Sequence, residues 1–332
     1  MKSGIYIYGI IKTSDHQDFG NIGIGDETSN VLTLGFKDIA AVVSESPFTV
    51  YDSLAKEKTV KDLVTHQFVL EKVMESFTVL PMKFGTMVET EDEVIKFLEK
   101  GYALLSDELL KMEGKIELDV VARWELPKTL AAIYRDNPHI QSKQREFALK
   151  GSTVAVEEKV TLGQLVAELL QTKKASSTQL ILQTLKVEAL DVCLHDVAND
   201  EMILNAAFLL EKQNEESFNE TVTLLDQRLE NSVNFRVVGP LPSYSFSTIL
   251  LERIDPGSFE EAKKTLGLYG EITEKTVRDA YRQLAQISHP DAGSGENAPD
   301  FSRLHSAYRT LKNFVAHGLM RVEVYHWEKD FQ

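Results

Sequence analysis

Cysteine is nearly absent from this chain, because Cys193 is the only one among 332 residues. A lone thiol cannot form a disulfide within the chain, which favours a reducing, cytoplasmic compartment. Basic residues are also few, since 36 Lys and Arg stand against 51 Asp and Glu and leave a net charge of −15. A surface of this sign should repel the phosphates of nucleic acids, so we expect no nucleic-acid partner.

Long hydrophobic runs are missing as well. No apolar stretch approaches the roughly 20 residues of a membrane-spanning helix, so we expect no membrane span. The opening residues, MKSGIYIYGI, have the composition of a strand and not of a signal peptide. Cys193 and His195 alone do not make a zinc site. No nucleophile with its base and no dinucleotide-binding glycine pattern stands out, so the sequence predicts no catalytic residue, no cofactor and no metal.

Apolar residues make up 43% of the chain, which is enough for hydrophobic cores in two or three domains. Hydrophobic periodicity predicts the order β-β-α-β-α-β over residues 1–126, with the last strand at 116–124. Residues 127–254 predict a second mixed unit: helices at 127–175, with a break near Gly151, and at 214–230, and strands at 180–194, 201–211, 233–238 and 246–251. This pattern indicates an α+β fold of two ferredoxin-like units, followed by a small helical domain at 255–320 and a tail at 321–332.

The helix predicted at residues 55–77 follows an apolar pattern at helical spacing, made by Val60, Leu63, Val64, Phe68, Val73 and Phe77. His66 lies beside this stripe, and we expect it to be a helix-face residue with its hydrogen bonds satisfied.

Two segments near the C-terminus have helical periodicity and flank the tripeptide His289-Pro290-Asp291. Their apolar residues recur three or four apart: Val277, Tyr281, Leu284 and Ile287, then Phe301, Leu304, Tyr308 and Leu311. Lys275, Arg278 and Arg282 lie on a different face of the first segment. The pattern predicts two antiparallel helices joined by a polar loop.

Together with Leu266-Gly267-Leu268 and residues 280–285 (AYRQLA), this order of motifs resembles the J domain, the module that engages DnaK-type chaperones. Over residues 258–315 the resemblance implies a chaperone contact at His289, Pro290 and Asp291. It also implies that Lys275, Arg278 and Arg282 are the charged helix face of that contact. A plain turn, or a J-like fold that binds another accessory protein, is the alternative for this segment.

Four motifs in the first 250 residues resemble those of the gas vesicle F/L family (GvpF and GvpL). They are residues 66–74 (HQFVLEKVM), 80–86 (LPMKFGT), 204–209 (LNAAFL) and 239–246 (GPLPSYSF). In the last motif, Leu241 stands where tryptophan is usual. The residues that the resemblance marks are expected to shape a strand entry and a buried turn: Pro81, Phe84, Gly85, Gly239, Pro240, Tyr244 and Phe246.

The resemblance implies an accessory protein of gas vesicle assembly and not an enzyme, located in the cytoplasm in association with gas vesicles. The implied partners are the small hydrophobic shell protein GvpA and other accessory gas vesicle proteins. An apolar shell subunit is prone to aggregate before it assembles, so a soluble acidic binder would shield it. The J-like segment would then recruit a DnaK-type chaperone to the bound subunit.

Two other functions stay open on the sequence alone. One is a general J-domain co-chaperone whose α+β region selects unrelated clients. The other is a ligand-binding or catalytic domain that shares only its fold with the family.

Overall fold

The computed structural model describes residues 3–25, 29–49, 51, 57–229, 232–288 and 301–327. These residues form two compact units. Unit 1 comprises Met1–Val69, Met82–Asp107 and Ile249–Val324, and unit 2 comprises Leu70–Pro81, Glu108–Thr248 and Tyr325–Gln332. Each unit is therefore assembled from segments that lie far apart in the sequence.

Unit 1 contains a sheet in which the strands follow the order β2-β3-β4-β1, with β6 also paired to β1. The strand bounds are β1 (Ser3–Lys12), β2 (Asp18–Gly23), β3 (Ser29–Phe36), β4 (Ile39–Pro47), β5 (Val79–Pro81) and β6 (Met87–Val88). Strands β1 and β4 pair antiparallel and are buried along most of their length, as expected when both faces of a strand are covered. The composition of residues 31–45 predicts two short strands or a hairpin, and the structure has the hairpin of β3 and β4. Residues 12–30 are polar and rich in glycine, which predicts a loop, but β2 lies within them.

Helix α1 (Glu57–Met74) confirms the helix predicted at residues 55–77. Residues 90–93 (TEDE) have the pattern of a capping box, which predicts a helix up to about Met112, and α2 (Glu91–Met112) confirms it. The Oγ of Thr90 accepts a hydrogen bond from the backbone N–H of Glu93 at 3.3 Å, which caps the start of α2. Gly114 follows the end of α2 with a φ of 73°, a conformation that glycine adopts without strain.

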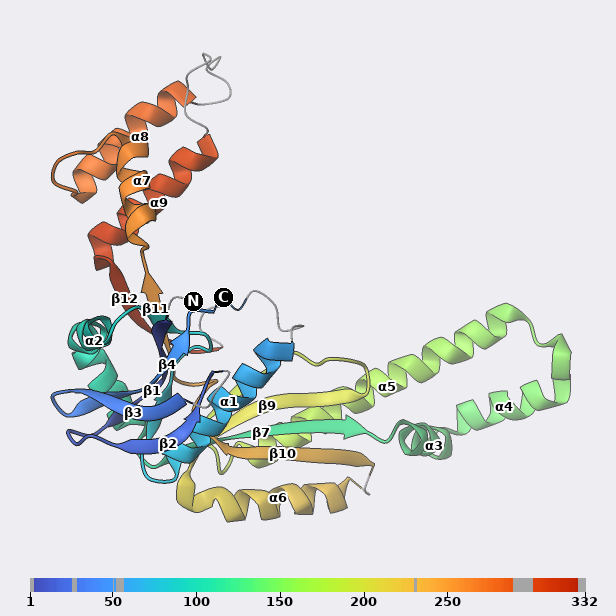
Figure 1. The fold of residues 1–332 in the computed structure, drawn as a ribbon. Coiled ribbons are helices and arrows are strands. Elements are labelled where there is room, and N and C mark those ends of the chain that lie inside the picture. Colours follow the sequence, from blue (N-terminus) through green and yellow to red (C-terminus); the bar gives the residue numbers. More distant parts are fainter. Residues whose placement is uncertain are drawn as a thin grey trace. The chain divides into compact units, whose positions relative to one another are not determined.

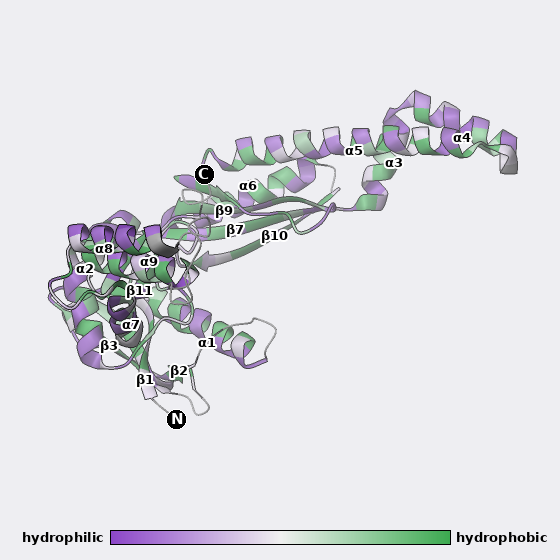
Figure 2. Cartoon of the chain, turned by 90° about the horizontal axis from the view of Figure 1, so that it is seen from above, coloured by the Kyte–Doolittle hydropathy of each residue, from purple (hydrophilic) through white to green (hydrophobic). Residues whose placement is uncertain are grey.

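Unit 2 is built on an antiparallel sheet with the strand order β10-β7-β9-β8. The bounds are β7 (Lys115–Trp124), β8 (Asp191–Leu194), β9 (Met202–Glu211) and β10 (Val233–Leu241). The central strands β7 and β9 are mostly hydrophobic (Figure 2). Helix α6 (Glu215–Arg228) and the end of α5 (Val156–Leu185) complete this core through Phe218, Ile181 and Leu185.

Three further helical segments precede the body of α5: α3 (Leu126–Asp136), α4 (Pro138–Lys150) and the short 3-10 turn η1 (Gly151–Thr153). The predicted helical region with a break near Gly151 is thus confirmed. The predicted strand is wrong over residues 180–185, which continue α5. Ile181 and Leu185 are one helical turn apart and both buried, so the helical period continues through a segment whose composition suits a strand.

The C-terminal part of unit 1 contains β11 (Thr248–Arg253), α7 (Pro256–Leu266), α8 (Glu274–Ser288), α9 (Phe301–His317) and β12 (Met320–Tyr325). Helices α8 and α9 run antiparallel, as predicted (Figure 1). The rings of Tyr281 and Tyr308 stack between them with centroids 4.3 Å apart. Strand β12 occupies part of the expected tail and pairs with β11, so the helices are inserted between two paired strands.

The structure divides the chain differently from the expected boundary at residue 126. Strand β7 was expected to end the first domain, but it lies between β10 and β9 in the sheet of unit 2. Unit 1 therefore lacks the last strand of the β-β-α-β-α-β order. The reason is physical: alternating hydrophobicity indicates which face of a strand is buried but not which sheet the strand joins.

Candidate functional site

Helix α1 has an unusual distribution of polar and apolar side chains. Three polar side chains on one face are almost fully buried, at 4%, 3% and 1% exposure: Thr59, Asp62 and His66. Three apolar side chains at four-residue spacing are exposed, at 48%, 62% and 51%: Val60, Val64 and Phe68. In an ordinary surface helix the apolar stripe faces the core, and α1 follows that arrangement only in its last part, where Val69, Leu70 and Val73 are buried. The pattern that predicted the helix correctly therefore lies partly on the solvent side; we call Val60, Val64 and Phe68 the α1 stripe.

The buried face of α1 is organised around His66. The hydroxyl of Tyr6 lies 3.0 Å from Nδ1 of His66 and accepts the backbone N–H of Gly85 at 2.9 Å. A neutral imidazole that accepts the Tyr6 proton at Nδ1 carries its own proton on Nε2. Burial lowers the pKa of His66 to about 4, so the ring is neutral near pH 7. Nε2 has no hydrogen-bond partner among the residues that the structure describes, contrary to the expectation for His66.

The motif at residues 80–86 packs against the same face. The Phe84 ring lies 5.7 Å from the His66 ring and 4.6 Å from the Tyr51 ring, between ring centroids. Tyr51 donates a hydrogen bond to Asp62 Oδ2 at 2.9 Å, and burial raises the pKa of the Tyr51 hydroxyl. Gly85 has a φ of 84°, and a Cβ at this position would lie 2.9 Å from Cδ2 of Tyr51. The motifs at 66–74 and 80–86 thus meet behind the α1 stripe.

Pro81, the remaining marked residue of that motif, ends β5 and is buried. The next residue, Met82, donates its backbone N–H to the carbonyl of Tyr8 at 2.9 Å. Proline cannot donate to a strand ladder, so its place at the end of a strand is one that its chemistry permits.

In the motif at residues 239–246, Gly239 to Leu241 end β10 beside β7 in unit 2, and the residues that follow form a turn. Gly239 has a φ of 148°, and a Cβ there would lie 2.5 Å from Cδ2 of Leu118 and 2.8 Å from the carbonyl oxygen of Glu117. Pro240 follows through a cis peptide bond. Tyr244 is partly buried, which raises the pKa of its hydroxyl, and Phe246 is buried. No side chain larger than hydrogen fits at position 239 without movement of its neighbours.

Two serines in and beside this turn hydrogen-bond to buried carboxyl groups. Ser245 donates both its backbone N–H and its hydroxyl to Glu117, each at 2.8 Å, and Ser247 donates to Glu108 Oε1 at 2.8 Å. Burial, and secondly the charge of Asp119, raise the pKa of Glu117 to about 8. The turn is therefore fixed to the sheet of unit 2 by buried polar groups.

Ser245 also lies 3.2 Å from His195, measured from Oγ to Nε2. Serine–histidine pairs activate nucleophiles when the hydroxyl proton is directed at the imidazole. Here the hydroxyl donates to Glu117 instead, and Ser245 is buried. The His195 ring contacts Trp327 edge-on, with ring centroids 5.1 Å apart. These contacts fit a role in packing, and they give no positive sign of catalysis.

The basic residues that the sequence analysis singled out lie on α8. Lys275, Arg278 and Arg282 are all exposed, whereas Val277 of the same helix is buried. The tripeptide His289-Pro290-Asp291 lies outside the described residues.

Sequence reasoning missed several residues of these clusters, notably Tyr6, Asp62, Glu117 and Ser245. One signal was available for α1, because Thr59, Asp62 and His66 recur at helical spacing and form a polar face of their own. Nothing comparable marks Glu117, since its partner Ser245 is 128 residues further along the chain.

Among the described residues, no group of three or more His, Cys, Asp or Glu side chains is placed to hold a metal ion. Over the same residues, no helix combines the length and hydropathy needed to cross a membrane.

The mixed α+β fold is that of solved gas vesicle proteins. The chain is similar to the crystal structure of GvpF from Anabaena sp. PCC7120, with a TM-score of 0.58 and 28% identity over 73% of this chain and 97% of that one. It is also similar to GvpF from Microcystis aeruginosa, with a TM-score of 0.52 and 25% identity over 73% of this chain and 98% of that one. The family model for gas vesicle synthesis proteins GvpL/GvpF matches residues 4–248. The chain belongs to the GvpL/GvpF family.

Relatives in sequence agree with this assignment. Gas vesicle protein F of Nostoc sp. PCC 7120 is 30% identical over 258 residues, which cover 75% of this chain and 100% of that protein. Gas vesicle protein F of Streptomyces sp. CB03234 is 31% identical over 245 residues, which cover 73% of this chain and 98% of that protein. About a quarter of this chain extends beyond these relatives, and residues 249–332 lie outside the family match.

Proposed function

We propose that this chain acts in gas vesicle assembly by binding the hydrophobic shell protein GvpA through the α1 stripe. Membership of the GvpL/GvpF family supports the role in assembly. The observation that carries the choice of surface is the first part of α1, which keeps Val60, Val64 and Phe68 exposed and buries Asp62 and His66. Exposed apolar groups at this spacing form the kind of stripe on which an apolar helix docks.

The energetics favour a binding role over an accident of packing. Burying apolar surface stabilises a protein by roughly 25 cal/mol per Å², and α1 forgoes that gain along its outer face. The buried polar groups on its inner face are held by specific hydrogen bonds to Tyr6 and Tyr51. These bonds keep α1 in the orientation that presents the stripe. The net charge of −15 would keep a complex with an apolar subunit in solution.

Co-purification of GvpA with the full chain tests this proposal. The double variant Val64→Glu/Phe68→Glu places two charges on the stripe, and we expect it to recover at least tenfold less GvpA than the wild type. Leu224→Glu on α6 is the matched control, because Leu224 has the same 62% exposure as Val64. The control should recover GvpA normally. Equal recovery by the double variant, with an unchanged melting temperature, would rule out the stripe as the binding surface.

We also infer that the chain works by binding and not by catalysis, in the cytoplasm and in association with gas vesicles. Other accessory gas vesicle proteins are further expected partners, and nucleic acid is not. Support comes from the family assignment, the single cysteine and the acidic surface.

A second proposed activity is recruitment of a DnaK-type chaperone by the helices inserted between β11 and β12. The face formed by Lys275, Arg278 and Arg282 is exposed, and α8 and α9 have the predicted antiparallel arrangement. Gly267 ends α7 with a φ of 66°, and Leu268 donates its N–H to the carbonyl of Lys263, which is the helix ending that the Leu-Gly-Leu motif permits. These features support a J-like module in which His289, Pro290 and Asp291 would make the chaperone contact.

The ATPase rate of DnaK measured with the full chain tests this second activity. We expect the wild type to stimulate the rate, and His289→Gln and Arg278→Ala to abolish most of the stimulation. Lys264→Ala on α7 is the control and should stimulate normally. If the wild type does not stimulate the ATPase rate, the J-like module does not recruit a DnaK-type chaperone. A general co-chaperone is the alternative, and it predicts capture of many clients from cells without gas vesicle genes.

We further propose that unit 2 is ferredoxin-like. Its elements follow the order β7, α3–α5, β8, β9, α6 and β10, which is β-α-β-β-α-β. The strand order β10-β7-β9-β8 supports the same description.

A further inference from the structure

A groove of about 450 Å³ runs between α4 and α5 in unit 2. Its apolar lining consists of Phe147 from α4 and Leu162 and Leu165 from α5, all of them half-buried. Its charged lining residues are Lys143 on the α4 side and Glu158 and Glu168 on the α5 side. The groove therefore combines apolar and charged side chains, as surfaces that bind an amphipathic helix do.

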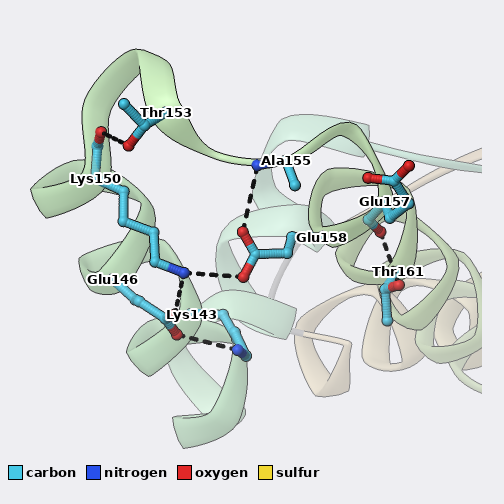
Figure 3. Close-up of polar contacts among 8 residues, drawn as sticks. All are labelled: Lys143, Glu146, Lys150, Thr153, Ala155, Glu157, Glu158 and Thr161. Atoms are coloured by element: carbon cyan, nitrogen blue, oxygen red, sulfur yellow. Dashed lines mark hydrogen bonds and ion pairs between the residues drawn. The ribbon is translucent and has the colours of Figure 1, made fainter.

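Polar contacts fix the two helices where they join. Lys150 bridges Glu146 and Glu158, with nitrogen–oxygen distances of 2.7 and 2.9 Å, and Lys143 also contacts Glu146 at 3.0 Å (Figure 3). The second carboxylate oxygen of Glu158 accepts the N–H of Ala155 at 3.3 Å and caps the start of α5. These contacts set the spacing of the two helices at the closed end of the groove.

The far end of α5 is fixed independently. Ser177, Ile181 and Leu185 are buried, and the last two belong to the core under the sheet of unit 2. Between these two anchors, Leu162 and Leu165 keep part of their surface in solvent. The sequence thus holds α4 and α5 at a separation that their own side chains do not fill.

Beside the groove the two helices carry opposite charge, although Lys173 and Lys174 make α5 neutral over its whole length. Helix α4 has Lys143, Arg145 and Lys150 against Glu146 alone. Residues 156–172 of α5 have Glu157, Glu158 and Glu168 against Lys159 alone. A surface with one basic and one acidic side is complementary to itself when a two-fold axis places α4 of one copy on α5 of another. The alternative pairing, with α4 on α4, would bring like charges together and is disfavoured.

We propose that this groove is a self-association site that takes the α4–α5 pair of a second copy of this chain. The two helix pairs form a four-helix bundle that buries Phe147, Leu162 and Leu165 of each copy. The basic and acidic edges set the relative orientation of the copies. This surface is separate from the α1 stripe and does not depend on the function proposed for it.

Sedimentation velocity of the full chain over a range of concentrations tests the proposal. We expect a reversible dimer, and we expect Leu165→Glu to raise its dissociation constant more than tenfold. Val160→Glu is the matched control, because Val160 is an exposed residue of α5 that does not line the groove. It should dimerise as the wild type does. A wild type that stays monomeric at every concentration would overturn the proposal.

Charge exchange gives a second test, because Lys143 and Glu168 line the groove from opposite sides. Lys143→Glu and Glu168→Lys should each weaken the dimer several-fold, and the double variant should recover most of the loss. Circular dichroism confirms that each variant is folded. A dimer that none of these substitutions affects would place the interface elsewhere and contradict the proposal.

Discussion

At the scale of single residues, Glu117 is the carboxyl group whose environment differs most from water. Burial and the nearby Asp119 raise its pKa from an ordinary 4.5 to about 8. The folded state therefore holds a proton that the unfolded state releases above pH 4.5. Stability from this group is fully present below pH 4.5 and is lost as the pH rises through about 8.

Glu117→Gln removes this dependence, because an amide stays neutral at every pH. We expect the wild type to lose stability between about pH 5 and pH 8 and the variant to lose less of it, as measured by urea denaturation at both pH values. The exposed Glu113→Gln serves as the control. The same pH slope in the wild type and in Glu117→Gln would contradict the buried, protonated carboxyl.

His66 gives a prediction of the opposite sign. Its pKa is lowered from 6.5 to about 4 by burial, so protonation favours the unfolded state and stability falls as the pH drops below 6.5. Nuclear magnetic resonance of the ring should find His66 neutral at about pH 5, with its proton on Nε2. Titration near 6.5 would contradict the burial of the ring.

Two glycine-to-alanine substitutions test where the backbone requires glycine and where it does not. Gly239→Ala should destabilise the chain by on the order of 3 kcal/mol, because its φ is positive and a Cβ would lie 2.5 Å from Leu118. Gly163→Ala in α5 should stabilise it by up to about 1 kcal/mol, since no atom lies within 4 Å of a Cβ there. Denaturant midpoints measure both effects. If the two substitutions changed stability equally, the positive φ and the close contact at Gly239 would not be the cause of its destabilisation.

At the scale of elements, α5 joins a packed half and an open half. Ser177, Ile181 and Leu185 are buried, whereas residues 156–172 contain no buried residue. We expect amide hydrogens of residues 156–172 to exchange at least tenfold faster than those of 177–185. Mass spectrometry of peptides from α5 measures this difference. The proposed dimer should reduce it at high protein concentration, and uniform protection along α5 in the monomer would contradict the description.

The helices also show how much of the fold could be predicted from the sequence. The helices at 55–77, 90–112 and 214–230 were predictable because their apolar residues recur at helical spacing over several turns. The end of α5 was not, because residues 180–185 suit a strand by composition and only their contacts with the sheet decide the outcome. The face of α1 was not predictable either, since burial of Asp62 depends on Tyr51, which the pattern cannot reveal.

At the scale of the whole molecule, the chain has two regions. One is the part that matches the family, and the other contains the helices inserted between β11 and β12. Residues 4–248 match the GvpL/GvpF model, and the match to the Nostoc protein covers 100% of that protein and 75% of this chain. The motifs made the family predictable, but they could not reveal that β12 returns to pair with β11. Pairing over such a distance leaves no local signal.

The same division gives a prediction for the complete chain. A variant with Arg278→Ala and Arg282→Ala on α8 should bind GvpA as the wild type does, because the α1 stripe is unchanged. It should lose stimulation of DnaK. Co-purification and ATPase rates on the same preparations measure both properties. Loss of GvpA binding in this variant would contradict separate surfaces for the two partners.

The central claim is that the α1 stripe is needed to build gas vesicles, and complementation tests it most directly. Cells with a gas vesicle gene cluster that lacks its own GvpF receive either the wild-type chain or Val64→Glu/Phe68→Glu, expressed at equal levels. The measurement is light scattering that disappears when pressure collapses the vesicles. We predict that the wild type restores it and the double variant does not. Full restoration by the double variant would contradict the account.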